Sequence, residues 1–176
     1  MNMNNTQKFS HAEIFFTTIF TITFIFQIIM MFFLETIFDL PFLTIIGWII
    51  WAFSIYFAII PFLTFKKRGD VDQGKSYIHT NKVVKNGAYA IVRHPQYLGG
   101  ILFSISITLW NPVWLNIILT LIIIILTYQW TYSEDRMLIE KFGEDYTSYK
   151  KKVPRLNPIL GIIKYLIYKE KNVKFN

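Results

Sequence analysis

The sequence contains no cysteine, and this absence excludes disulfide bonds, thiolate metal sites and a cysteine nucleophile. Acidic residues are also scarce, since 11 Asp and Glu stand against 18 Lys and Arg and leave a formal net charge of +7. Neither a metal centre nor a nucleic-acid partner is expected. Any chemistry must therefore be carried by nitrogen, carboxylate or hydroxyl groups.

Apolar residues are what the chain has in abundance. Of its 176 residues, 53% are hydrophobic and 18% are aromatic. A soluble domain rarely combines this composition with so large a positive charge, whereas an integral membrane protein with basic loops does so naturally. The chain is therefore predicted to be a single integral membrane domain over residues 1–176, all-α and polytopic.

Four apolar stretches are predicted to be membrane spans, because a helix needs about 20 residues to cross a hydrocarbon core of about 30 Å. They are residues 14–34, 42–65, 95–110 and 113–130. The first is too long for the core of a signal peptide and is interpreted as a retained span. The last two are expected to form a helical hairpin that begins at Pro95 and turns at Asn111-Pro112.

The placement of basic residues indicates how these spans are oriented. All 18 Lys and Arg lie before the first span, between the second and third, or after the fourth. The other two connections carry none, so the positive-inside rule places every basic segment and both chain ends in the cytoplasm. Only an even number of spans gives this pattern, which supports a count of four.

Three further segments lie outside the spans. Residues 66–96 are predicted to be a basic loop with little helix or strand pattern. Residues 133–152 are predicted to form an amphipathic helix at the membrane surface, which could break at Gly143, because apolar side chains recur there at helical spacing. Residues 159–168 are apolar but too short to cross, and are expected at the interface.

The predicted hairpin places two charged pairs together. Arg93 and His94 precede its first arm, and Glu134 and Asp135 follow its second. The two arms differ in length by only about five residues, or roughly 7.5 Å along a helix axis. We therefore expect the basic and the acidic pair to face one another near the cytoplasmic surface.

Such a site suits a ligand that carries both charges. Arg93, His94 and the free N–H groups at the start of the Pro95 helix favour a carboxylate or phosphate, and the acidic pair favours hydroxyls, amines or a cation. S-adenosylmethionine carries a carboxylate, a diol and a positive centre. The same residues also have purely structural interpretations. Arg93 and His94 would lie at the membrane interface, Arg93 as an anchor, and Glu134 and Asp135 would be ordinary acids in the first turn of a helix. Gly99-Gly100 would serve helix packing.

The same residues resemble the signature of a known family. The pattern reads Gly87-x-Tyr89-x-x-x-Arg93-His94-Pro95-x-Tyr97-x-Gly99, and it continues with Glu134-Asp135, Leu138, Phe142-Gly143, Tyr146, Tyr149 and Val153-Pro154. It resembles the isoprenylcysteine carboxyl methyltransferase family, which also includes phospholipid N-methyltransferases. The similarity covers residues 76–160, and this region is expected to hold the cofactor and the catalytic groups.

The resemblance implies an integral membrane methyltransferase that uses S-adenosylmethionine, and the absence of a Gly-x-Gly-x-x-Gly pattern agrees with a non-Rossmann enzyme. By resemblance, Arg93 would orient the reacting carboxylate or the cofactor. The cofactor-binding residues that it implies are His79, His94, Pro95, Tyr97, Gly99, Glu134 and Asp135. Asp135 departs from the family, where a second glutamate is usual, and its shorter side chain has less reach.

The methyl acceptor remains open. The resemblance implies a lipophilic acceptor, either prenylcysteine-like or a phospholipid amine, and a small thiol is a further possibility. A carboxylate acceptor would be ionised already, whereas an amine would need Glu134 or Asp135 as a base. Two other classes are a sterol-type reductase that uses NADPH and a non-catalytic membrane scaffold; binding of NADPH, or of neither cofactor, would identify them.

Overall fold

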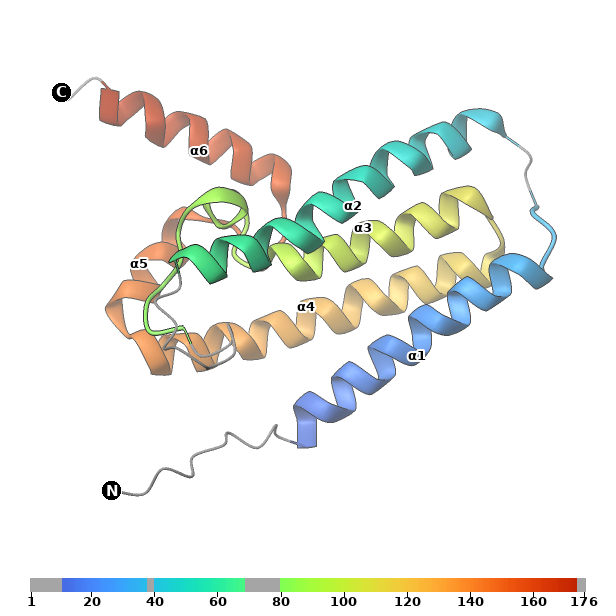
Figure 1. The fold of residues 1–176 in the computed structure, drawn as a ribbon, viewed down its shortest axis with the longest axis horizontal. Helices are drawn as coiled ribbons and strands as arrows, with labels where there is room; N and C mark the ends of the chain where they lie inside the picture. The colour runs from blue at the N-terminus through green and yellow to red at the C-terminus, as the bar shows by residue number, and fades with distance from the viewer. Residues whose placement is uncertain (1–10, 38–39, 69–79, 174–176) are drawn as a thin grey trace.

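In the computed structural model, the described residues are 11–37, 40–68 and 80–173, and they contain helices and no strand. Figure 1 shows the helices labelled α1, α2, α3 and α4 running side by side along the molecule. The elements are α1 (His11–Phe33), α2 (Pro41–Arg68), the short 3₁₀ helix η1 (Gly87–Ala90), α3 (Pro95–Trp110), α4 (Trp114–Phe142), α5 (Glu144–Lys152) and α6 (Pro158–Val173). The predicted all-α class is confirmed.

Three of these helices, α1, α2 and α4, are long and apolar enough to cross a membrane. The fourth expected span, α3, has 16 residues and is shorter than a typical crossing helix. It begins at Pro95 and ends at Trp110, as the hairpin prediction required. The contact between α3 and α2 is more extensive than the contact between any other two described helices. A polytopic helical bundle is the result.

The prediction of one separate amphipathic helix over residues 133–152 is wrong for the first half of that segment. α4 continues without a break from Trp114 to Phe142, so the first half of that segment extends the last span. The break falls at Gly143, where φ is +56°, a left-handed conformation that glycine adopts at little cost. Only α5 is a separate helix, and Figure 1 shows it turning back from the end of α4 on the side toward α6.

The predicted loop over residues 66–96 is also more ordered than expected. α2 continues to Arg68, and Gly87–Ala90 form the 3₁₀ helix η1 immediately before the Arg-His pair. The side chains of Ala88 and Tyr89 are buried, so η1 fixes the path of the chain into α3.

Gly99 explains how α3 approaches α2 so closely. A Cβ placed there would lie 2.9 Å from the backbone nitrogen of Ala58 and 3.1 Å from the oxygen of Ser54. The hydroxyl of Ser54 donates to the carbonyl oxygen of Gly99 at 3.0 Å. Small residues allow such approaches between membrane helices. The structure thus supports the helix-packing interpretation of Gly99.

α1 is joined to the hairpin through polar side chains that we call the neutral cluster: Gln27, Ser104, Thr108 and Thr120. Gln27 is fully buried, and it is the only buried side chain among those described on α1. Its Nε2 donates to Thr120 Oγ1 at 3.0 Å, and its Oε1 accepts from Ser104 Oγ at 2.9 Å. Thr120 also shares hydrogen bonds of 2.7 Å with Ser104 and with Thr108.

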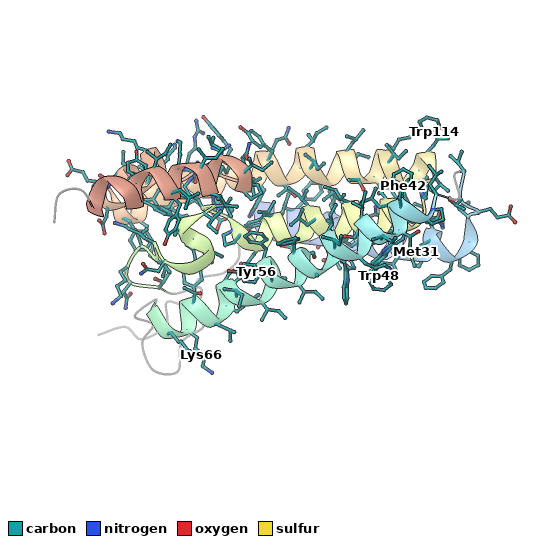
Figure 2. The ribbon with its side chains drawn as sticks, turned by 90° about the horizontal axis from the view of Figure 1, so that it is seen from above. Met31, Phe42, Trp48, Tyr56, Lys66 and Trp114 are labelled. Atoms are coloured by element: carbon teal, nitrogen blue, oxygen red, sulfur yellow. The ribbon has the colours of Figure 1, made fainter. Side chains whose placement is uncertain are left out.

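Large apolar side chains cover the outside of the bundle. Phe42, Trp48 and Trp114 are more than half exposed, as expected for surfaces that contact lipid. Figure 2 shows them toward one end of the molecule and Lys66 toward the other. α6 follows α5 and displays exposed isoleucine and leucine side chains along its length.

Candidate functional site

The site is built where the chain enters α3. The N–H groups of Arg93 and His94 donate to the carbonyl oxygens of Pro154 and Arg155, at 3.0 and 3.3 Å. The segment after α5 therefore pairs with the segment before α3. These two N–H groups are occupied, so any anion bound at the start of the helix would have to use N–H groups further along.

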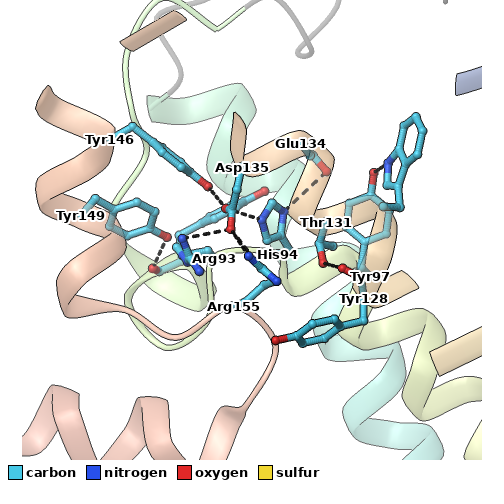
Figure 3. A network of polar contacts seen from close by, with 12 residues as sticks. Arg93, His94, Tyr97, Tyr128, Thr131, Glu134, Asp135, Tyr146, Tyr149 and Arg155 are labelled. Atoms are coloured by element: carbon cyan, nitrogen blue, oxygen red, sulfur yellow. Dashed lines mark hydrogen bonds and ion pairs between the residues drawn. The ribbon is translucent and has the colours of Figure 1, made fainter. Parts of the chain in front are cut away.

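Asp135 lies at the centre of what we call the charged cluster: Arg93, His94, Asp135, Tyr146 and Arg155 (Figure 3). Its side chain is only 1% exposed. Oδ1 lies 3.0 Å from His94 Nε2 and accepts from the Tyr146 hydroxyl at 2.5 Å. Oδ2 lies 2.9 Å from both Nε and Nη2 of Arg155, and 3.2 Å from Arg93 Nη1.

Glu134 approaches the same histidine from its other side. Its Oε2 lies 3.5 Å from His94 Nδ1, and its side chain is 30% exposed, in contrast to the buried Asp135. The predicted meeting of the basic and acidic pairs is therefore confirmed. The two acids differ in their surroundings, since Glu134 faces open space and Asp135 is enclosed by its partners.

His94 is held between these two carboxylates. Burial lowers the pKa of His94, but its hydrogen bond with Asp135 and the nearby carboxylate of Glu134 outweigh that effect, so the pKa is raised above the ordinary value of 6.5. Burial, together with the neighbouring carboxylate of Asp135, raises the pKa of Tyr146 well above its usual range. Tyr146 thus remains a neutral donor to Asp135.

A cleft of about 770 Å³, counted with its open mouth, lies beside the charged cluster. The residues that line it include five that the sequence singled out: Arg93, His94, Pro95, Tyr97 and Glu134. Asp135 and Gly99 are absent from the lining, and His79 lies outside the described residues.

Several buried polar atoms beside the cleft make no hydrogen bond within the described part of the chain. They are Nε and Nη1 of Arg93, Nε2 of Gln96 and Oε2 of Glu134. Buried polar groups normally find partners, so these atoms indicate where a ligand would supply them. Donors from Arg93 and Gln96 suit an anionic or carbonyl group, and Glu134 suits a hydroxyl or an amine.

Tyr97 connects the cleft to the lipid-facing side of the bundle. Its hydroxyl accepts a hydrogen bond from Trp130 Nε1 at 2.8 Å, and the ring of Trp130 stacks on Phe16 of α1 at 4.5 Å. The ring of Tyr97 lies edge-on to His94, with centroids 5.9 Å apart. Tyr97 therefore links the charged groups at the cleft to aromatic side chains of α4 and α1.

Sequence reasoning missed two residues of this region. Arg155 was not singled out, although it is the arginine immediately after Val153-Pro154, where the amphipathic pattern ends. Gln96 falls on an unspecified position of the Arg-His-Pro-x-Tyr signature, and it contributes an unpartnered amide to the cleft. Neither contact follows from periodicity, because each depends on segments distant in sequence.

The comparisons with known proteins point to one family. Residues 42–145 match the family model described as phospholipid methyltransferase. The protein-S-isoprenylcysteine O-methyltransferases of Mus musculus and Homo sapiens are each 36% identical over 96 residues, which is 53% of this chain and 33% of theirs. That of Schizosaccharomyces pombe is 29% identical over 102 residues, 51% of this chain and 42% of its own.

The chain thus spans about a third of the length of the mammalian relatives that it matches. No solved structure matches it. Both charged pairs lie inside the matched residues 42–145, and Arg155 lies beyond them.

Proposed function

The chain belongs to the phospholipid methyltransferase family, and on that premise we propose that it is an integral-membrane methyltransferase that uses S-adenosylmethionine. Its acceptor is lipophilic, and the relatives named protein-S-isoprenylcysteine O-methyltransferase favour a carboxylate at the end of a prenylated group. The observation that carries the proposal is the set of buried polar atoms on Arg93, Gln96 and Glu134 that make no hydrogen bond within the described residues, around one cleft beside His94.

The residues present fit this cofactor by their chemistry. Arg93 offers Nε, which makes no hydrogen bond within the described residues, to a carboxylate, and Glu134 offers a carboxylate oxygen to a ribose hydroxyl or an amine. Bound S-adenosylmethionine would supply an electrophilic methyl group on a sulfonium centre. His94, Pro95 and Tyr97 line the same cleft and would position it.

The protein's part in the reaction is mainly orientation. When the protein holds the nucleophile and the methyl group in line, the two no longer have to meet in a bimolecular encounter. This can lower the activation free energy by several kcal/mol, and by about 7 kcal/mol or more in the most favourable cases. A carboxylate nucleophile is ionised near pH 7 and needs no base, so Arg93 would only have to hold it and shield it from water. An amine would need to lose a proton, and Glu134 is the exposed carboxylate available.

The placement of the cleft suits a polar cofactor and a lipophilic acceptor. With the basic segments on the cytoplasmic side, the charged cluster lies at the inner membrane surface. The cofactor would then arrive from the cytoplasm, and the apolar part of the acceptor from between the spans, past aromatic side chains such as Trp130 and Phe16.

The direct test is transfer of a labelled methyl group from S-adenosylmethionine by the purified chain in micelles. The acceptor panel contains a prenylcysteine, phosphatidylethanolamine and a small thiol. We expect transfer to the prenylcysteine carboxyl. Transfer to the lipid amine would change the acceptor class, whereas binding of NADPH in place of S-adenosylmethionine would refute the proposal.

His94→Ala is expected to weaken S-adenosylmethionine binding at least about 100-fold while the fold persists. Asp135 would keep Arg155, Tyr146 and Arg93 as partners, so its charge stays compensated. Calorimetry measures the binding, and circular dichroism checks the fold. Undiminished binding by the variant would contradict the assignment of His94.

Arg93→Lys is expected to lower turnover about 10–100-fold, because a lysine cannot replace the planar fork of a guanidinium at a carboxylate. The matched control is Lys82→Arg, because Lys82 lines the same cleft. Wild-type turnover in Arg93→Lys would count against a role in holding a carboxylate.

A further inference from the structure

Arg155 stands outside the family match and outside the cleft lining, yet it reaches the centre of the charged cluster. We propose that Arg155 is a positioning residue: it makes the closest contacts with Oδ2 of Asp135 and thereby leaves donors of the Arg93 guanidinium available to the ligand, while His94 stays in place. The assignment of the ligand rests on the proposed function, but the positioning itself does not.

The distances distinguish the two arginines that share Oδ2. Arg155 brings Nε and Nη2 to 2.9 Å, and its Nε donates a hydrogen bond. Arg93 brings only Nη1, at 3.2 Å, and neither that atom nor its Nε donates a hydrogen bond within the described residues. Arg155 therefore makes the closer contacts of the two arginines with Oδ2 of Asp135, and Arg93, which lines the cleft, keeps Nε without a hydrogen bond.

Arg155 is itself fixed on three sides. Its guanidinium lies over the rings of Tyr128 and Tyr132, at 5.0 and 5.1 Å from their centroids. Its carbonyl oxygen accepts from the N–H of His94 at 3.3 Å. The side chain is 12% exposed, so it is largely shielded from water. Arg155 thus holds the main chain of His94 through its own carbonyl oxygen, and it holds the side chain of His94 through Asp135.

Removal of Arg155 has a specific electrostatic consequence. Oδ2 would be left to Arg93, whose guanidinium would turn toward Asp135 and away from the cleft. The loss of a neighbouring positive charge would also strengthen the attraction of Asp135 for a proton on His94. The variant keeps the other charged or titratable groups around His94 and the cleft, which are Lys82, Tyr89, Arg93, Tyr97, Glu134, Asp135, Tyr146 and Tyr149.

The test compares Arg155→Gln and Arg155→Lys in the full chain. Calorimetry measures S-adenosylmethionine binding, and NMR follows the titration of the His94 ring. Arg155→Gln is expected to weaken binding about 10–100-fold, as loss of charge-assisted hydrogen bonds does, and to move the His94 titration to higher pH. Arg155→Lys keeps the charge, so the His94 titration should return toward wild type while binding recovers only in part.

Arg136→Gln is the matched control. Arg136 is exposed and lies over the same Tyr132 ring at 5.3 Å, but it makes no ion pair with any described residue. Wild-type binding by Arg155→Gln, an equal loss in Arg136→Gln, or an unmoved His94 titration would overturn the proposal. If Arg155→Gln does not fold, binding by Arg155→Lys decides: a partial loss supports the proposal and wild-type affinity overturns it.

The experiment also separates the two proposals. If the wild-type chain does not bind S-adenosylmethionine, the proposed function fails. The His94 titration needs no cofactor, so it still tests whether Arg155 controls the charge at this site. A shift in Arg155→Gln that is absent in Arg136→Gln would support the positioning role by itself.

Discussion

The molecule contains two buried polar clusters that behave in opposite ways. The neutral cluster joins α1 to the hairpin through hydroxyls and one amide, whose hydrogen bonds are made to one another and to the backbone. The charged cluster contains ionisable groups and leaves donors of Arg93 without a partner beside a cleft. A closed cluster specifies helix arrangement, whereas an incomplete one indicates a ligand site.

The energetic reasons differ as well. Neutral hydrogen bonds between membrane helices contribute about 0.6 kcal/mol on average and at most about 1.7. A buried carboxylate is costly to leave unpaired, and removal of one partner from such a pair typically costs about 3–5 kcal/mol. Disruption of the two clusters should therefore have effects of different size and kind.

The largest effect is expected for Asp135→Leu. The change leaves Arg93, Arg155 and His94 facing an apolar side chain, so the free energy of unfolding should fall by about 3–5 kcal/mol. Denaturant titration in micelles, followed by tryptophan fluorescence, measures it. A decrease of less than about 1 kcal/mol would mean that the charged cluster stabilises the fold no more than the neutral cluster does, and would contradict the distinction between them.

A smaller effect is expected for Gln27→Leu. Hydrogen bonds to Ser104, Thr108 and Thr120 are lost, but those three residues can still bond to one another, so unfolding should become easier by about 1–2 kcal/mol. S-adenosylmethionine binding should stay within about twofold of wild type. A large loss of binding would show that the neutral cluster also supports the site.

The smallest effect is expected from pH. Because the pKa of His94 is raised in the folded chain, its contribution to stability is fully present below its ordinary value of 6.5 and is lost as pH rises through the raised pKa. One group can give a slope of at most about 1.4 kcal/mol per pH unit. Unfolding midpoints between about pH 6 and 9 should fall in wild type, and His94→Gln should flatten that slope.

Tyr146 and Tyr149 do not contribute in that pH range, since their pKa values are raised and both stay protonated. The neutral cluster contains no ionisable group. A pH dependence that persists unchanged in His94→Gln would therefore have to come from outside both clusters, and would contradict this assignment.

The sequence predicted a considerable part of this arrangement. Uncharged stretches gave α1, α2 and the hairpin, because a chain without charges for about 20 residues has few alternatives to a span. The turn at Asn111-Pro112 predicted that Arg93 and His94 would meet Glu134 and Asp135, and the distances confirm that meeting. Their roles in binding remain predictions.

The errors have identifiable physical causes. The continuation of α4 to Phe142 was missed because charged residues interrupt an apolar pattern without interrupting a helix. The neutral cluster was missed because one glutamine and scattered hydroxyls in an apolar stretch carry no periodic signal. Gly99 had two interpretations, and only its closeness to the α2 backbone favours packing.

The sequence by itself determined the membrane class and the two charged pairs, since these depend on composition and on order along the chain. Of the four spans that it predicted, three are helices long and apolar enough to cross a membrane. Only the tertiary structure decided which acid is enclosed and which lines the cleft, and that Arg155 contacts Oδ2 of Asp135 at a shorter distance than Arg93 does. The reason is physical: a pair of charges becomes specific through burial and through contacts between distant segments, and neither is written in local sequence.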